Sequence, residues 1–158
     1  MSTRTAWRIV KAARVRDAFS GEGARRAGGR WNPPGAAVVY TAGSLALAAL
    51  EVLVHLDGPQ LLPSYLQIPV EFDQGLCRYL DLAALPPDWS DNPAPASTRR
   101  MGAEWIASQA SLILAVPCAV VPDELVFLIN PAHRDLPRLQ IGKPASFRFD
   151  PRLIKNLP

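Results

Sequence analysis

The chain has 158 residues, 49% of them hydrophobic and 20% charged, a composition typical of one globular domain rather than a disordered or fibrous protein. No apolar run reaches the roughly 18 to 20 residues of a membrane span, and the first residues lack the apolar region of a signal peptide. We therefore expect a single cytoplasmic domain over residues 1–158 with no membrane partner. Two cysteines without CxxC spacing and two histidines are too few ligands for a zinc site, so we predict no metal.

The net charge of +3 is spread unevenly along the chain. Residues 1–30 hold eight arginines and lysines against Asp17 and Glu22, a net charge of +6, so the remainder carries −3. Such a segment suits a phosphate-bearing ligand, a nucleic acid or an acidic partner surface. A solvated basic face that only aids solubility has the same composition.

The first 42 residues predict a strand, a loop and a second strand. Residues 6–10 are typical of a short strand, whereas residues 14–32, rich in glycine and arginine, predict a loop whose backbone comes close to a ligand. A dinucleotide-binding fingerprint is excluded, because G-x-G-x-x-G requires glycine where Arg26 stands. A turn at N-P-P-G and a β-like run over residues 36–42 follow.

The middle of the chain predicts an apolar helix and a strand. Ser44 is a suitable N-cap for a helix that begins at Leu45, and D-G-P at residues 57–59 predicts its end. Residues 65–72 alternate as a strand does, and Pro69 within them predicts an edge or a bulge.

The second half predicts a loop, a helix and further strands. Residues 85–95 are typical of a surface loop, and residues 98–111 have helical spacing. Short strands are predicted at 112–117, 119–122, 125–130 and 146–150. Because this order lacks the regular alternation of a doubly wound fold, we predict an α+β domain with a split or mixed, mostly antiparallel sheet and flanking helices.

Glu51 is the one carboxylate in the apolar helix. A charge buried on all sides is costly unless it is paired or faces a polar cavity. Glu51 therefore either lines a pocket or points to water from a half-buried helix, and its apolar neighbours one turn away favour the pocket. His55 either hydrogen-bonds Glu51 or is a satisfied near-core histidine at the helix end.

Two residues upstream suit a shared ligand. Arg30 ends the glycine-rich segment, where its planar fork suits a pyrophosphate, and Tyr40 offers a ring for a heteroaromatic base. A carboxylate such as Glu51 suits a sugar carbon that becomes cationic as its bond to a leaving group stretches. Together the three describe a site for breaking an N-glycosidic bond in a phosphorylated ligand. Singly, Arg30 also fits a surface ion pair and Tyr40 a core aromatic.

Six motifs follow one another over residues 7–153, in the order W-R-I-V, G-G-R-W-N, V-V-Y-T-A-x-S-L-A-L-A-x-L-E-x-L-V-H, V-P-x-A-V-V-P, L-I-N-P-A-H and F-R-F-D-P-R-L. In order and spacing they resemble those of the RES-domain toxins of bacterial toxin-antitoxin pairs. The resemblance implies a fold similar to the diphtheria-toxin-like ADP-ribosyltransferases, with NAD as the substrate. It also implies that ADP-ribose passes either to water or phosphate, which depletes NAD, or to a protein side chain.

The same resemblance implies the site residues. The family takes its name from an Arg, a Glu and a Ser, of which Arg30 and Glu51 are the first two, and Tyr40 occupies the tyrosine position. We therefore predict Glu51, Arg30 and Tyr40 as catalytic residues, and Arg30, Tyr40, Trp31 and Cys118 as NAD-binding residues.

The third name-giving position holds Cys118 instead of serine. A thiol is a larger and weaker hydrogen-bond partner than a hydroxyl. Either that contact is dispensable here, or the site is tuned for another acceptor, or Cys118 only packs beside the pocket. Asn130 and His133 also match the family, and we interpret them first as turn-forming residues.

The family implies a partner, an antitoxin with a helix-turn-helix domain that blocks the toxin's pocket. The basic N-terminal segment suits that contact or the NAD phosphates. An alternative is a nucleic-acid-binding or ribonuclease toxin acting through this segment, but its arginines lack interleaved exposed aromatic residues and no histidine pair is placed for RNA cleavage. A third hypothesis is a non-enzymatic interaction module.

Overall fold

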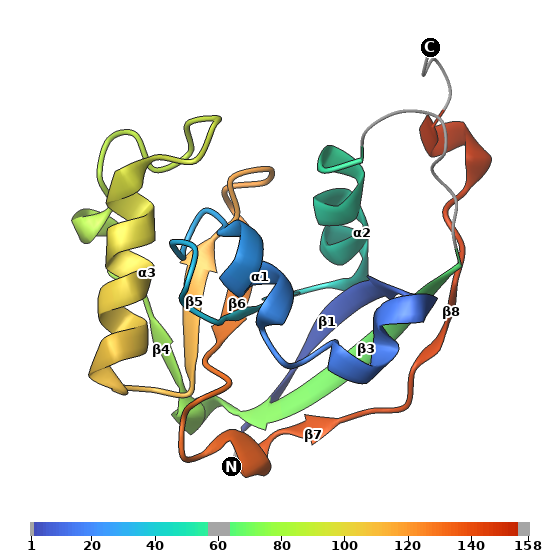
Figure 1. Cartoon of the computed structure of the whole chain (residues 1–158), viewed down its shortest axis with the longest axis horizontal. Helices are drawn as coiled ribbons and strands as arrows, with labels where there is room; N and C mark the ends of the chain where they lie inside the picture. Colours follow the sequence, from blue (N-terminus) through green and yellow to red (C-terminus); the bar gives the residue numbers. More distant parts are fainter. Residues whose placement is uncertain (1, 57–63, 155–158) are drawn as a thin grey trace.

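The computed structural model describes residues 2–56 and 64–154, and within them the strands form one eight-stranded sheet (Figure 1). Its order is β4-β5-β6-β2-β1-β3-β7, with β8 also paired to β3. The strands are β1 Thr3–Lys11, β2 Val39–Ala42, β3 Tyr65–Asp73, β4 Cys77–Tyr79, β5 Ile113–Pro117, β6 Leu125–Ile129, β7 Gln140–Ile141 and β8 Ala145–Phe147. Only the pair of β4 and β5 is parallel among these strands.

Three α-helices and several short 3-10 helices accompany the sheet. In Figure 1, α3 and α2 stand on either side of β5 and β6, and α1 runs in front of them. None of the helices in the described part of the chain has the length and apolar character that crossing a membrane requires. The helices are α1 Glu22–Ala27, α2 Leu45–Val54 and α3 Ala96–Ser108, with 3-10 turns at Ala12–Asp17, Gln74–Leu76, Leu82–Ala84, Leu136–Arg138 and Pro151–Ile154.

The central strands separate two apolar layers, because successive side chains point to opposite faces of a sheet. One layer contains Leu114 and Val116 of β5 with Leu128 of β6, and it packs beneath residues of α2 and α3. The opposite layer contains Ile113 and Phe127 with side chains from β3 and the C-terminal part of the chain. The helices thus cover only one face of these strands.

The sheet is split between β1 and β2. These two strands share the single pair of Trp7 and Ala42, whereas β1 and β3 pair along their whole length. The side chain of Arg8 spans the split: its Nη1 donates to the backbone oxygen of Tyr40 at 3.0 Å, and its Nε donates to Ala18. Burial lowers the pKa of Arg8 to about 10. A split, mostly antiparallel sheet in an α+β domain was the sequence prediction, and it is confirmed.

The two helices predicted from sequence are both present. Ser44 caps α2 by accepting a hydrogen bond from the Leu47 amide at 3.1 Å, as its sequence position predicts. The stop predicted at residues 57–59 lies outside the described residues. Helix α3 begins and ends within three residues of the predicted 98–111.

Three local predictions are wrong. The segment 14–32 is not all loop, because it contains α1, which is bounded by Gly21 and Gly28, both with positive φ. These glycines break the chain at the helix ends rather than marking an open loop. Residues 119–122 form no strand but the turn between β5 and β6, closed by the Cys118 amide on the Glu124 oxygen at 2.9 Å. The strand predicted at 146–150 ends at Phe147.

Pro69 does not lie on an edge strand or in a bulge. It sits inside β3, opposite Trp7 of β1, and β3 has strands on both sides. Its backbone oxygen accepts from the Gly142 amide at 2.8 Å, so its nitrogen also faces the β7 side. There β8 pairs only with residues 65–67 and β7 with 70–71, so the missing N–H of proline falls between two short strands.

Candidate active site

Strand register brings the predicted site residues onto one face of the sheet. Tyr40 of β2 pairs with Leu128 of β6, which pairs with Leu114 of β5. These residues belong to the layer beneath the helices, and Cys118, just beyond β5, belongs to it as well. Helix α2, which carries Glu51, packs against β1 and β2 on the same face. Residues about 70 positions apart in sequence thus meet on the helix-covered side.

Glu51 points toward the protein even though its helix is only half buried. The outer side of α2 exposes Leu50 and Val54, at 38% and 54% of their surface, whereas Leu47 and Ala48 are buried. Glu51, one turn after this buried pair, is partly exposed, and its Oε1 accepts a hydrogen bond from the Cys118 thiol at 2.8 Å. Of the two sequence interpretations, the fully solvated carboxylate is therefore wrong.

The Cys118 thiol, just beyond the end of β5, hydrogen-bonds the Glu51 carboxylate of α2. Its side chain is 1% exposed, and burial, together with the hydrogen bond to Glu51, raises the pKa of the thiol to about 11. Cys118 is therefore a neutral thiol at physiological pH, and it donates a hydrogen bond to the carboxylate. In this structure its contact is with Glu51, and its predicted contact with NAD stays a prediction.

The Tyr40 hydroxyl is bound within the protein. It donates to Asn32 Oδ1 at 2.6 Å and accepts from the Trp31 amide at 3.0 Å. Burial is the main cause that raises the pKa of Tyr40 far above its ordinary value, against the opposing effects of the Trp31 amide and of the Arg99 and Arg30 charges. A Cβ atom on Gly29 would lie 2.6 Å from this hydroxyl, so the turn requires glycine at that position.

Asn32 organises the turn and was missed by sequence reasoning. It has no exposed surface, and its Nδ2 donates to the backbone oxygens of Ala24, Pro33 and Ala36 at 2.8, 3.2 and 2.9 Å. Asn32 thus joins the end of α1, the N-P-P-G turn and Tyr40. The available signal was an amide in a segment rich in glycine and proline, which suggested only a turn.

Arg30 contacts backbone rather than a carboxylate. Its Nη1 donates to the oxygens of Trp89 and Asp91, at 2.9 and 2.7 Å, in the predicted 85–95 loop. Its own backbone oxygen accepts from the Thr98 hydroxyl at 2.7 Å. No carboxylate of the described residues lies within 4.0 Å of its guanidinium, so the surface-ion-pair interpretation is wrong for this part of the chain.

Helix α3 packs directly on the turn that carries Arg30. A Cβ atom on Gly102 would lie 1.5 Å from the backbone oxygen of Trp31, which leaves no room for any side chain there. Arg99, on the same helix, donates from Nε to the Gly29 oxygen at 3.1 Å. The Trp31 side chain is 2% exposed and fills the core, so its predicted contact with NAD stays a prediction.

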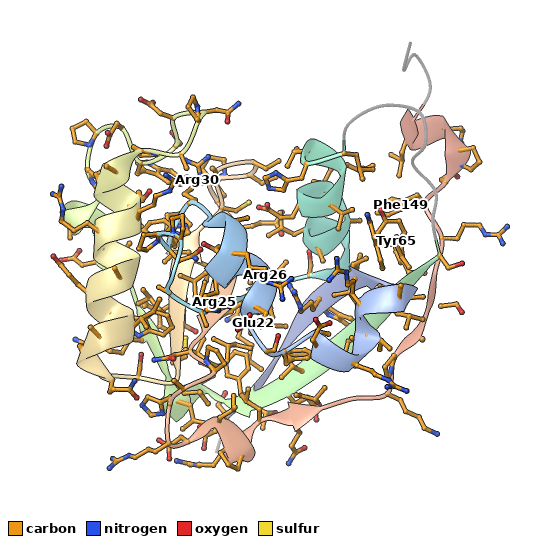
Figure 2. The ribbon with its side chains drawn as sticks, viewed as in Figure 1. Glu22, Arg25, Arg26, Arg30, Tyr65 and Phe149 are labelled. Atoms are coloured by element: carbon orange, nitrogen blue, oxygen red, sulfur yellow. The ribbon has the colours of Figure 1, made fainter. Side chains whose placement is uncertain are left out.

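Figure 2 shows Arg30 apart from the other labelled arginines of the N-terminal segment. Arg25 and Arg26 lie on α1 and contact Glu22, at 2.8 and 3.9 Å. Both are exposed, so these charges face solvent, whereas Arg30 lies between the turn and the 85–95 loop. The basic segment is therefore divided between a solvated face and the candidate site.

The hydrogen bonds of Asn130 and His133 shape the segment that follows β6. Asn130 Oδ1 accepts from the Ala132 amide at 3.0 Å, and the His133 ring contacts the Gln109 oxygen at 3.1 Å and the Asp135 amide at 3.1 Å. Their predicted turn-forming role is confirmed. His55 ends α2 but is exposed, so its predicted near-core position is wrong. No cluster of three metal-ligating side chains occurs within residues 2–56 and 64–154.

Comparison with known proteins identifies the family. Residues 5–150 match the family model of the RES domain. A Yersinia enterocolitica protein, Toxin Res, is 39% identical over 148 residues, which cover 93% of this chain and 97% of the relative. A Sphingobium protein, Prs ADP-ribosylating toxin, is 38% identical over 159 residues, which cover 98% of this chain and 99% of the relative.

Among solved structures, the fold is similar to a chain in the crystal structure of the M. tuberculosis MbcT-MbcA toxin-antitoxin complex. The TM-score is 0.72 at 22% identity, with 99% of this chain and 89% of that chain covered. This likeness bears on the fold, whereas the family match spans most of the sequence. The chain belongs to the RES-domain family.

Proposed function

We propose that this protein is the toxin of a toxin-antitoxin pair and cleaves the nicotinamide-ribose bond of NAD, passing ADP-ribose to a protein side chain, water or phosphate. One observation carries the proposal: Cys118, which hydrogen-bonds Glu51, belongs to the same helix-covered layer as Tyr40, and the Tyr40 hydroxyl accepts from the amide of Trp31, the residue after Arg30. An acid, a cation and an aromatic ring are thus carried by connected segments on one side of the sheet. The name of the Sphingobium relative, an ADP-ribosylating toxin, supports the same chemistry.

Glu51 acts on the ribose in this proposal. The bond between the ribose carbon and the nicotinamide nitrogen breaks, and its electron pair leaves with nicotinamide. The nucleophilic atom of the acceptor then bonds to the same carbon, and any proton that this atom carries is released to solvent. The carboxylate stabilises the positive charge that develops on the ribose between these events. The Cys118 hydrogen bond engages Oε1, whereas Oε2 has no recorded partner among the described residues and is available for the ribose.

Arg30 and Tyr40 bind the pyrophosphate and the nicotinamide, which lie on opposite sides of that bond. Arg30 Nη1 is anchored on two backbone oxygens, which orients the guanidinium and leaves its other nitrogens for the pyrophosphate. The Tyr40 hydroxyl already bonds Asn32 and Trp31, so the ring face, rather than the hydroxyl, contacts nicotinamide. The sequence hypothesis likewise assigned the Tyr40 ring to the base.

The direct test is release of nicotinamide when the purified protein is mixed with NAD. We expect release by the wild-type protein and almost none by Glu51→Gln. Glu104→Gln, which changes an exposed glutamate on α3, is the matched control and retains wild-type release. Lack of release by the wild type, or undiminished release by Glu51→Gln, contradicts the proposal.

A second assay separates the acceptors. NAD labelled in the ADP-ribose part is incubated with the protein and a cell lysate. Label attached to a protein identifies a transferase, whereas label recovered only as free ADP-ribose or its phosphate identifies a hydrolase or a phosphorylase. Neither the geometry of Glu51 nor that of Cys118 selects among these acceptors.

The partner proposed from the sequence is an antitoxin with a helix-turn-helix domain that blocks this site. The similar solved structure is that of a toxin-antitoxin complex, which supports an antitoxin partner. Pull-down of the neighbouring gene product with the protein, followed by loss of nicotinamide release, tests it. The nucleic-acid alternative gains no support from the basic segment, since Arg8 and Arg30 are held inside the fold and Arg25 is paired with Glu22.

A further inference from the structure

A second arginine, Arg99, contacts the turn that carries Arg30. Arg99 comes from α3, far along the chain, yet its Nε donates to the oxygen of Gly29, the residue immediately before Arg30. The adjacent Thr98 donates to the oxygen of Arg30 itself. Gly102, one turn further on, lets the helix contact the Trp31 backbone. Three successive contacts therefore fix α3, and with it Arg99, against the turn.

Neither arginine has a protein anion to neutralise it. The ion pairs of the described residues use Arg25, Arg26, Arg138 and Arg152, and none involves Arg30 or Arg99. Both are partly buried and bond backbone oxygens instead. Two like charges at one turn repel each other, so an unpaired arrangement of this kind is stabilised by an anion that binds between them.

Each guanidinium also has N–H groups that bond no acceptor among the described residues. The recorded bond of Arg99 uses Nε, and those of Arg30 use Nη1, so the remaining nitrogens of both groups have no recorded partner in the described part of the chain. The charges of both arginines lower the pKa of Tyr40, with Arg99 the larger of the two effects. Both arginines also touch the same turn as the Tyr40 hydroxyl: Arg99 bonds Gly29, and the hydroxyl accepts from the amide of Trp31, the residue after Arg30.

We propose that Arg99 is a second phosphate-binding residue of this site and that, with Arg30, it makes the site selective for a diphosphate over a monophosphate. Two guanidiniums can bind two linked phosphate groups, whereas one fork is satisfied by a single phosphate. The inference rests on the proposed function, because it assigns Arg99 to the pyrophosphate of NAD.

The test compares binding of inorganic pyrophosphate and of orthophosphate by isothermal titration at fixed ionic strength. We expect the wild-type protein to bind pyrophosphate at least about tenfold more tightly than orthophosphate, a difference of about 1.4 kcal/mol. In Arg99→Gln this preference falls to within about threefold, and Arg99→Lys lies between, because it keeps the charge without the fork. Arg100→Gln, an exposed arginine one position on, keeps the wild-type preference.

Nicotinamide release provides the second measurement. Arg99→Gln should raise the KM for NAD about tenfold while kcat changes less than about threefold, because a binding contact remote from the reacting bond is lost. If Arg99 merely ties α3 to the turn, its loss lowers Tm and kcat and leaves the pyrophosphate preference unchanged. That result, or a wild-type protein that does not prefer pyrophosphate, overturns the inference.

The two proposals fail in different ways. If wild type and Arg99→Gln release nicotinamide with the same KM, the inference is wrong and the proposed function stands. If the wild type releases no nicotinamide but binds pyrophosphate in a manner that depends on Arg99, the diphosphate site stands and the proposed NAD cleavage is wrong.

Discussion

The candidate site has two sides, which we call walls: one carries Arg30 and Tyr40, and the other carries Glu51. The two walls are stabilised in different ways. The wall that carries Arg30 and Tyr40 is a network, in which Asn32 alone makes four hydrogen bonds and α3 adds contacts from Thr98 and Arg99. The wall that carries Glu51 depends on the packing of α2 and on one thiol-carboxylate bond. The proposed NAD-binding groups are thus held by many hydrogen bonds, and the proposed catalytic carboxylate by one. Loss of the Asn32 network should therefore alter stability, and changes at Glu51 or Cys118 should alter rate.

The largest expected effect is on rate. Glu51→Gln should lower nicotinamide release by about 10³-fold, on the order of the loss seen when one stabilising group is removed from a transition state. Stability should change little, because glutamine keeps the shape and Glu51 is partly exposed. Release kinetics and thermal unfolding measured together check this. A fall in Tm large enough to unfold the variant at the assay temperature would assign the loss to folding instead.

Asn32→Ala should have the largest effect on stability. It removes the four side-chain hydrogen bonds of Asn32. The Ala24 and Pro33 oxygens keep a backbone donor, whereas the Ala36 oxygen and the Tyr40 O–H group lose their partner, and each buried unsatisfied group costs about 1–3 kcal/mol. We expect a loss of at least about 2 kcal/mol in urea unfolding. Asn92→Ala, at an exposed asparagine of the 85–95 loop, is the control and should stay within about 0.5 kcal/mol. Equal stability of the two variants would show that the turn does not depend on Asn32.

Substitutions at Cys118 test whether its hydrogen bond positions the Glu51 carboxylate. Cys118→Ala removes the only recorded side-chain donor to Glu51 among the described residues and should lower kcat about tenfold, with KM nearly unchanged. Cys118→Ser restores a donor and should retain kcat within about threefold. Steady-state kinetics of the two variants provide the test. If serine and alanine are equally slow, the hydrogen bond does not position the carboxylate.

The smallest predicted effect is the pH dependence of stability. Burial raises the pKa of Cys118 from 9.0 to about 11, so the folded protein holds the thiol proton where the unfolded chain releases it. Stability is therefore unaffected by this group below about pH 9 and falls as the pH rises toward 11, by about 1 kcal/mol between pH 9 and 10. Cys118→Ser should lack this part of the fall. Cys77, whose pKa is also raised to about 11, titrates in both proteins, so the difference between the two unfolding curves isolates Cys118.

Sequence patterns predicted the parts of the fold that depend on local chemistry. Ser44 before an apolar run gave the start of α2, alternation gave β3, and short apolar runs bounded by proline and aspartate gave β5 and β6. They failed where distant strands decide the outcome. Pro69 was assigned to an edge because its tolerance depends on the interval between β7 and β8, which no local pattern contains. Glycine was interpreted as loop at Gly21 and Gly28, where it bounds a short helix.

In the candidate site, too, residues with a local sequence signal were predicted, and residues whose contacts join distant segments were missed. Glu51, Arg30 and Tyr40 were predicted from residue type and from the order of motifs, and their roles stay predictions; the structure places Glu51 in contact with Cys118. Asn32 and Arg99 were missed because their contacts cross from one segment to another: an amide with four partners and an arginine on a distant helix have no periodic signature. The hydrogen bond between Cys118 and Glu51 could likewise not be predicted from the sequence, because 67 positions separate the two residues.

The alternation of faces along β2 also governs where the chain tolerates a change in length. One residue inserted within Val39–Ala42 would turn Tyr40 away from Glu51 and toward the opposite apolar layer, because side chains switch faces at every position. Residues added to the turn between β5 and β6, after Cys118 and before Glu124, leave the register of both strands intact. Insertions and deletions among relatives should accordingly collect in such turns, while the spacing from Arg30 to Glu51 is held by geometry.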